Sequence, residues 1–151
     1  MTKEKIALEL LTQVFLNIPF NRILGLQLAH LSDQEVIITF KMQDELIGNY
    51  VQSILHGGVI SAVLDMVGGM LVMAKLVVIH SDKSIDELAE LLGRCSTTNL
   101  QINYLNPGRG DLFTARATLL KTGRKISFAQ MELMNQDGEK IATANGTYLV
   151  K

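Results

Sequence analysis

The sequence contains a single cysteine, Cys95, among its 151 residues. A lone cysteine excludes a disulfide framework and a cysteine-based metal motif. The three histidines, His30, His56 and His80, lie far apart and lack the spacing of a zinc-binding HExxH helix, so we expect no metal site. The formal net charge of −1 argues against a broad nucleic-acid-binding surface, although it is compatible with a local basic site for a small anion.

The chain also lacks repeats, linkers, low-complexity segments and the features of a secretory signal. Its 48% hydrophobic and 19% charged residues indicate a globular protein, and its length suits one domain with its own core. Glu9, Thr12 and Gln13 interrupt the apolar stretch near the N-terminus, unlike the core of a signal peptide. We therefore expect a single cytoplasmic domain over residues 1–151.

One apolar run, from Val59 to Ile79, approaches the length of a membrane span. Asp65, Lys75 and several glycines lie in or beside it and favour a buried helix of a soluble protein. We predict a helix over about residues 56–79, roughly 36 Å long at about 1.5 Å per residue. Because each interior glycine costs a helix up to about 1 kcal/mol, this helix needs close packing against a sheet or another helix.

Two further helices are expected outside this run. A helical stripe of apolar residues covers residues 3–18 and ends at Pro19, so residues 1–19 form the predicted N-terminal helix. Residues 80–93 form a predicted insertion with a short helix, in which Ser84 and Glu87 have capping-box spacing.

The remaining segments alternate between apolar and polar residues, which is typical of half-buried strands. Six strands are expected, over about residues 26–31, 35–42, 97–107, 113–119, 125–134 and 140–150. Residues 44–53 read as a loop, and the short connections after residue 97 predict an antiparallel meander. The predicted fold class is α+β: a hotdog fold, with an antiparallel sheet of about six strands wrapped around the long central helix.

The most informative motif is His56-Gly57-Gly58 followed by Asp65. Asp65 interrupts an apolar run, where a carboxylate is costly unless it is paired or has a chemical task. The two glycines allow another group to approach the backbone closely. The alternative interpretation is structural: Asp65 bonds to nearby backbone or to Ser61, and the glycines only permit tight helix packing.

A helix that opens with His-Gly-Gly and carries an aspartate seven residues after the second glycine resembles the PaaI-type hotdog thioesterases. The strand beginning at Thr97, the turn over residues 121–124 and the closing Asn145-Gly146-Thr147 are also similar to that family, so the resemblance covers about residues 24–150. It implies hydrolysis of acyl-coenzyme A thioesters without a metal or cofactor.

The resemblance also implies roles for individual residues. Asp65 corresponds to the general base or nucleophile, the Gly57 N–H to the group that polarises the thioester carbonyl, and Asn49 and Thr97 to assisting residues. We include His56 in the site, where we expect it to order its loop by hydrogen bonding.

A second set of residues is assigned to substrate binding. Its glycine and serine flank the motif, its methionine offers an adaptable apolar contact, and its cations suit the phosphates of coenzyme A. The set is Gly58, Ser61, Met66, Arg109, Arg124 and Lys125. The many aliphatic and few aromatic residues favour medium or long fatty acyl chains as substrates.

The distance between Gly57 and Asp65 predicts a dimer. Eight residues of helix span about 12 Å, whereas reacting atoms must lie about 3–3.5 Å apart. One thioester therefore cannot contact both residues of one chain. A two-fold homodimer with antiparallel helices would pair Asp65 of one subunit with Gly57 of the other at two equivalent sites, and a dimer of dimers is also compatible with the sequence.

Two other functions compete with thioester hydrolysis. A non-catalytic acyl-CoA sensor would keep the pocket but would not need Asp65. A hotdog dehydratase or hydratase would use a histidine beside an acidic residue, and His56 is too far from Asp65 on one chain for that chemistry.

Overall fold

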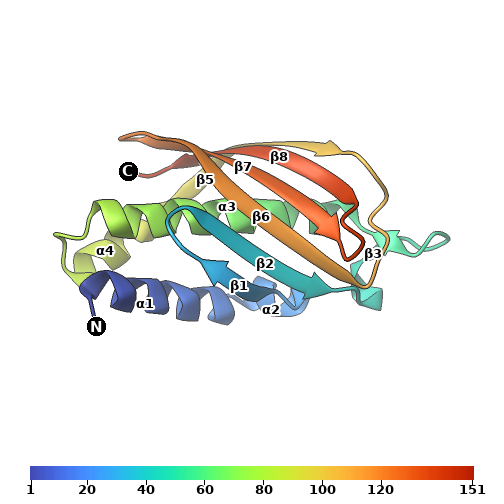
Figure 1. The fold of residues 1–151 in the computed structure, drawn as a ribbon, viewed down its shortest axis with the longest axis horizontal. Helices are drawn as coiled ribbons and strands as arrows, with labels where there is room; N and C mark the ends of the chain where they lie inside the picture. Colours follow the sequence, from blue (N-terminus) through green and yellow to red (C-terminus); the bar gives the residue numbers. More distant parts are fainter.

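The computed structural model describes all residues, 1–151, and contains one six-stranded antiparallel sheet in the order β1-β2-β6-β7-β8-β5 (Figure 1). Buried and exposed residues alternate along the long central strands, so one face of the sheet is apolar. The strands are β1 (Gln27–Leu31), β2 (Glu35–Lys41), β5 (Ser96–Tyr104), β6 (Leu112–Thr122), β7 (Ile126–Asn135) and β8 (Lys140–Leu149).

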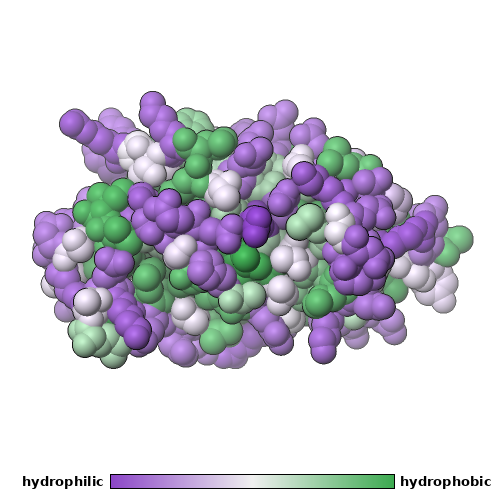
Figure 2. Space-filling model, in the orientation of Figure 1, coloured by the Kyte–Doolittle hydropathy of each residue, from purple (hydrophilic) through white to green (hydrophobic).

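The central helix α3 (Gly57–Ile79) lies along the apolar face of this sheet, with strands β2 and β6 crossing it (Figure 1). It is long and apolar enough to cross a membrane, but over half of its most apolar stretch is buried inside the protein. The prediction of a core helix wrapped by the sheet is therefore confirmed, and α3 is not left as a free apolar span. Hydrophilic residues predominate on the face shown in Figure 2, where hydrophobic residues form separate patches.

Three shorter helices complete the fold. Helix α1 (Lys3–Asn17) runs antiparallel to α3 and buries Ala7, Leu11 and Phe15. Helix α4 (Ile85–Leu92) packs against both of them near the C-terminal end of α3 and carries the predicted capping box. Helix α2 (Pro19–Leu24) was not predicted, because Pro19 was read only as a terminator. Proline also fits the first position of a new helix, where its missing N–H needs no acceptor.

Residues 44–53, predicted as a loop, contain ordered structure. A 3₁₀ turn, η1 (Asp44–Leu46), leads into the small hairpin of β3 (Ile47–Asn49) and β4 (Ile54–Leu55). This hairpin lies at the opposite end of the molecule from the two termini (Figure 1). Its strands are too short for an alternating sequence pattern to reveal them.

The predicted meander is wrong in one connection. Strands β6, β7 and β8 follow one another, but β5 pairs with β8 and not with β6. The segment between β5 and β6 crosses the end of the sheet and is held there by backbone hydrogen bonds: Leu105 and Asn106 donate to Ile141, and Met42 donates to Asp111. Because these partners come from distant parts of the chain, local spacing does not reveal the crossing.

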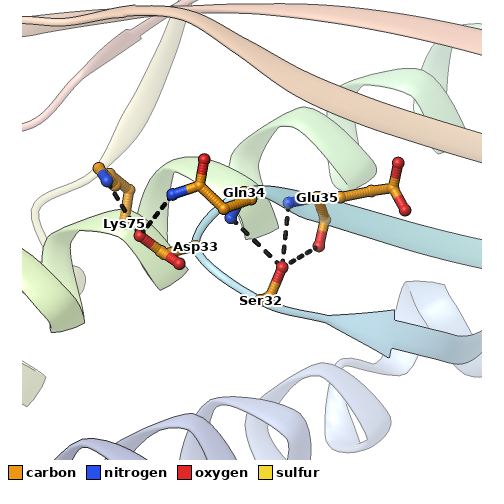
Figure 3. A network of polar contacts seen from close by, with 5 residues as sticks. All are labelled: Ser32, Asp33, Gln34, Glu35 and Lys75. Carbon is orange, nitrogen blue, oxygen red and sulfur yellow. Dashed lines mark hydrogen bonds and ion pairs between the residues drawn. The ribbon is translucent and has the colours of Figure 1, made fainter.

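The turn between β1 and β2 is attached to the central helix (Figure 3). Ser32 Oγ accepts the N–H groups of Gln34 and Glu35 at 3.3 and 3.1 Å, which closes the turn. Lys75 Nζ on α3 donates to Asp33 Oδ2 at 2.9 Å, and both side chains are about three-quarters buried. The hydrogen bond from Lys75 is the main reason that the pKa of Asp33 lies below its ordinary value.

Replacing Lys75 with methionine is expected to lower the free energy of unfolding at pH 7 by up to about 1 kcal/mol, the scale of a partly exposed ion pair. Because the folded-state pKa of Asp33 is depressed, this stabilisation is present above the unfolded pKa of about 3.9 and is lost as the pH falls through the folded value. Urea denaturation at several pH values measures it, with Lys121→Met as a control at an exposed lysine. A deficit that stays constant into acid would contradict this account.

Candidate active site

The sheet leaves one stripe of α3 uncovered. Ser61, Asp65, Gly69 and Met73 follow one another at four-residue spacing and are all partly exposed, whereas most other residues of the helix are buried. Four-residue spacing places side chains on the same side of a helix. Asp65 therefore lies near the middle of a side of α3 that another molecule can reach.

Thr97, a residue of the sheet, binds the Asp65 carboxylate. Thr97 Oγ1 in β5 donates a hydrogen bond of 2.7 Å to Asp65 Oδ1. A bulge in the pairing of β5 with β8 follows directly after Thr97. The two residues are far apart in the sequence, and the structure brings them together as the resemblance implied. Asp65 is only partly buried and lines a recess, so its carboxylate is accessible to another group.

Tyr148 holds the same turn of α3 and was missed from the sequence. Its hydroxyl, at the end of β8, donates to the backbone oxygen of Asp65 at 3.1 Å, and the residue is only 3% exposed. Burial, followed by the charge of Asp65, raises the pKa of the Tyr148 hydroxyl above its ordinary value, so it remains a donor at neutral pH. The sequence feature that could have indicated this residue is a pair of glycines, Gly68 and Gly146, which leave room for the Tyr148 ring.

The N-terminal end of α3 presents one free backbone donor. His56 caps the helix: its Nδ1 accepts the Gly58 N–H at 2.7 Å, so the side chain orders the start of α3. Tyr104 donates to the Gly57 carbonyl at 3.2 Å, and Ser61 Oγ donates to the Gly58 carbonyl at 3.0 Å. Ser61 thus does not bond Asp65. The Gly57 N–H has no acceptor within the chain, as is usual for the first N–H of a helix, so it is free to donate to another molecule.

A recess of about 160 Å³ opens beside Asp65. Residues of α3, the start of β5 and Tyr148 line it: Asp65, Met66, Gly69, Val72, Met73, Cys95, Ser96, Thr97 and Tyr148. Burial raises the pKa of the Cys95 thiol, so the thiol stays protonated at neutral pH and is a poor nucleophile. Asp65 is therefore the only carboxylate and the strongest general-base candidate in the recess.

The other expected site residues lie away from Asp65 within one chain. Asn49 Oδ1 accepts the Gln52 N–H at 3.1 Å, and Arg109 donates to the same Gln52 at 2.7 and 3.1 Å, so both order the β3–β4 hairpin. Arg124 and Lys125 lie in the β6–β7 turn, and Arg124 borders a hollow at the C-terminal end of α3. The three cations do not form one patch, and their binding to phosphates stays a prediction.

Residues 52–142 match the sequence profile of a family described as the thioesterase superfamily. The chain belongs to this superfamily. It is 41% identical over 145 residues to the medium/long-chain acyl-CoA thioesterase YigI of Escherichia coli (strain K12), covering 95% of this chain and 94% of the relative. The protein of that name from Salmonella typhimurium is 42% identical over the same length.

Solved structures of thioesterase-superfamily proteins share the fold. A crystal structure from Shewanella oneidensis, described as related to the thioesterase superfamily, aligns over 100% of both chains with a TM-score of 0.95 and 38% identity. A thioesterase from Haemophilus influenzae aligns with a TM-score of 0.74 over 94% of this chain and 88% of its own, and its 21% identity shows the fold alone. The predicted hotdog fold is therefore confirmed.

Two neighbouring glycines of α3 test the placement of Tyr148. A Cβ at Gly68 would overlap the Tyr148 hydroxyl and lie 2.9 Å from Met131 Sδ, whereas a Cβ at Gly69 would meet only Tyr148 Cε1, at 3.6 Å. We expect Gly68→Ala to lose about 1–3 kcal/mol of unfolding free energy through overpacking. Gly69→Ala should be neutral or gain up to about 1 kcal/mol of helix propensity. Thermal and urea denaturation compare the two, and equal effects would contradict the packing described.

Proposed function

We propose that the protein hydrolyses medium- and long-chain acyl-coenzyme A thioesters to the free acid and coenzyme A. The observation that carries this proposal is the Asp65 carboxylate on the uncovered side of α3, oriented by Thr97 and beside an apolar recess. The activity of the E. coli relative, which is similar along almost the entire chain, supports the same substrate class.

The proposed reaction needs one base or nucleophile and one oxyanion donor, and no metal or cofactor. In the general-base route, Asp65 takes a proton from water while the water oxygen attacks the thioester carbonyl carbon. In the nucleophilic route, Asp65 Oδ2 attacks that carbon and water hydrolyses the resulting anhydride. In both, the negative carbonyl oxygen accepts the Gly57 N–H. In the general-base route the C–S bond of the tetrahedral intermediate then breaks, and the departing sulfur takes the proton that Asp65 received from water. In the nucleophilic route the C–S bond breaks as the anhydride forms, before water hydrolyses it, and the thiolate of coenzyme A takes a proton from water.

The proposed site needs two subunits. Gly57 and Asp65 lie eight residues apart on α3, about 12 Å along its axis, so one carbonyl cannot contact both within one chain. We propose a two-fold homodimer in which the partner subunit's α3 runs antiparallel along the Gly57–Asp65 part of the helix, which leaves Gly69 and Met73 uncovered. Two features support it: β5 is an edge strand of the sheet, and Tyr104, which contacts Gly57, and the following Leu105 are 56% and 52% exposed.

Asp65→Asn is expected to abolish most thioester hydrolysis, because the amide can neither take the proton nor attack the carbonyl. Positioned acid–base groups contribute about 10²–10⁴-fold to rate, and kcat should fall on that scale. Release of free thiol from a series of acyl-CoAs measures it, with Asp86→Asn, an exposed aspartate on α4, as the matched control.

Unchanged turnover of Asp65→Asn would eliminate the Asp65 mechanism. If the wild-type protein binds acyl-CoA tightly but releases no thiol, the proposal fails in favour of a non-catalytic sensor. Hydration of an enoyl-CoA without thiol release would instead indicate a hydratase, although His56 Nδ1 is occupied by the Gly58 N–H.

Gly57→Pro removes the proposed oxyanion donor with little change of backbone. Gly57 is the first helical residue, where proline is well tolerated, and His56 before it has φ −61° and ψ 134°, which proline also accepts. Loss of one oxyanion donor typically lowers kcat by about 10²–10³-fold. Gly57→Ala keeps the N–H, and its Cβ makes only an ordinary contact with Tyr104 at 3.5 Å. Equal kcat values for the two variants would show that this N–H is not the donor.

A further inference from the structure

A second hollow lies between helices α1 and α4, separate from the recess beside Asp65. It has a volume of about 240 Å³, and every lining residue except Gly93 is hydrophobic. Leu10 and Val14 form its α1 wall, and Leu88, Ala89 and Leu92 form its α4 wall. Leu10 and Val14 are 46% and 57% exposed, so the hollow is an open groove rather than a sealed gap in the core.

Met73 connects this groove with the Asp65 recess, because it lines both. Asp65, Gly69 and Met73 stand on successive turns of the uncovered stripe of α3, and Met73 is about 12 Å from Asp65 along the axis. At Gly69 there is no side chain, and a Cβ there would meet only the edge of Tyr148. The path from the carboxylate to Met73 is therefore open along the helix.

We propose that this α1–α4 groove holds the distal part of the fatty acyl chain, which runs from Asp65 past Gly69 and over Met73. The inference rests on the proposed thioester hydrolysis and names the residues that select chain length. No charged or hydrogen-bonding side chain lines the groove, so a hydrocarbon fits it and a polar peptide does not. Its connection through Met73 to the reacting carboxylate distinguishes an acyl chain from an unrelated apolar partner.

The path predicts a threshold in chain length. A hexanoyl chain ends before Met73 and does not reach the groove, whereas a myristoyl chain passes Met73 and enters it. Each methylene buried there is worth about fourfold in affinity. Met73 suits this position because its unbranched side chain has several rotatable bonds and adapts to chains of different length.

Two variants alter the groove from opposite walls: one fills it and the other places a charge in it. Both substituted positions are exposed to solvent and lie outside the hydrophobic core. Ala89→Phe occupies the groove from α4, with Glu90→Phe as a control on the same helix outside it. Val14→Asp places a charge on the α1 wall, with Gln13→Asp as its control. We expect each groove variant to raise the KM for myristoyl-CoA at least tenfold, with kcat and all constants for hexanoyl-CoA within twofold of wild type. Thermal denaturation confirms that the variants are folded.

The outcomes separate this inference from the function on which it rests. A wild-type protein that releases thiol from neither acyl-CoA overturns the proposed function itself. Hydrolysis by the wild type, with both groove variants keeping its ratio of myristoyl to hexanoyl kcat/KM, overturns the groove assignment alone. Controls that shift this ratio as much as the groove variants also overturn it, because displacement of the helices would then explain the effect.

Discussion

The position of one carboxylate in an otherwise apolar helix constrains the rest of this structure. Asp65 costs free energy in such a place unless its neighbours bind it. Two strands supply those neighbours: Thr97 in β5 bonds the side chain, and Tyr148 in β8 bonds the backbone of the same residue. The edge strand β5 and its neighbour β8 therefore fix the rotation of α3, and with it the side of the helix that stays uncovered.

The uncovered side of α3 carries the groups that the proposed reaction uses. Along it, the helix offers a free N–H at Gly57, a carboxylate at Asp65 and an open path to Met73. A rigid helix keeps these groups at fixed separations, so Gly57 and Asp65 of one chain cannot meet at one carbonyl. The same rigidity that prevents a site within one subunit makes two equivalent sites natural in an antiparallel pair of helices.

Elements whose signals are local were predictable from the sequence. The apolar run predicted α3, the capping-box spacing predicted α4, and the alternation of apolar and polar residues predicted all six strands of the sheet. Features that depend on distant partners were not: β5 joins β8 through a register that no local pattern encodes. Helix α2 was missed because proline both ends one helix and begins another.

Some residues of the site could likewise be predicted from local sequence, and others could not. The motif around Gly57 singled out Asp65, but only the family resemblance connected Thr97 to it across the sequence. Tyr148 escaped notice because a tyrosine near the end of a strand is ordinary, and its hydroxyl reaches α3 only in the folded protein. Gly68 and Gly146 carried the signal, since both lack a side chain where the tyrosine ring lies.

The central claim is that Asp65 of one subunit acts with the Gly57 N–H of the other. Co-expression of Asp65→Asn and Gly57→Pro chains with different affinity tags allows the mixed dimer to be purified. Its intact Asp65 and intact Gly57 belong to different subunits and meet in one of the two proposed sites. The account predicts about half of the wild-type activity per mixed dimer, although each variant alone is nearly inactive. A mixed dimer as inactive as its parents would contradict the shared site.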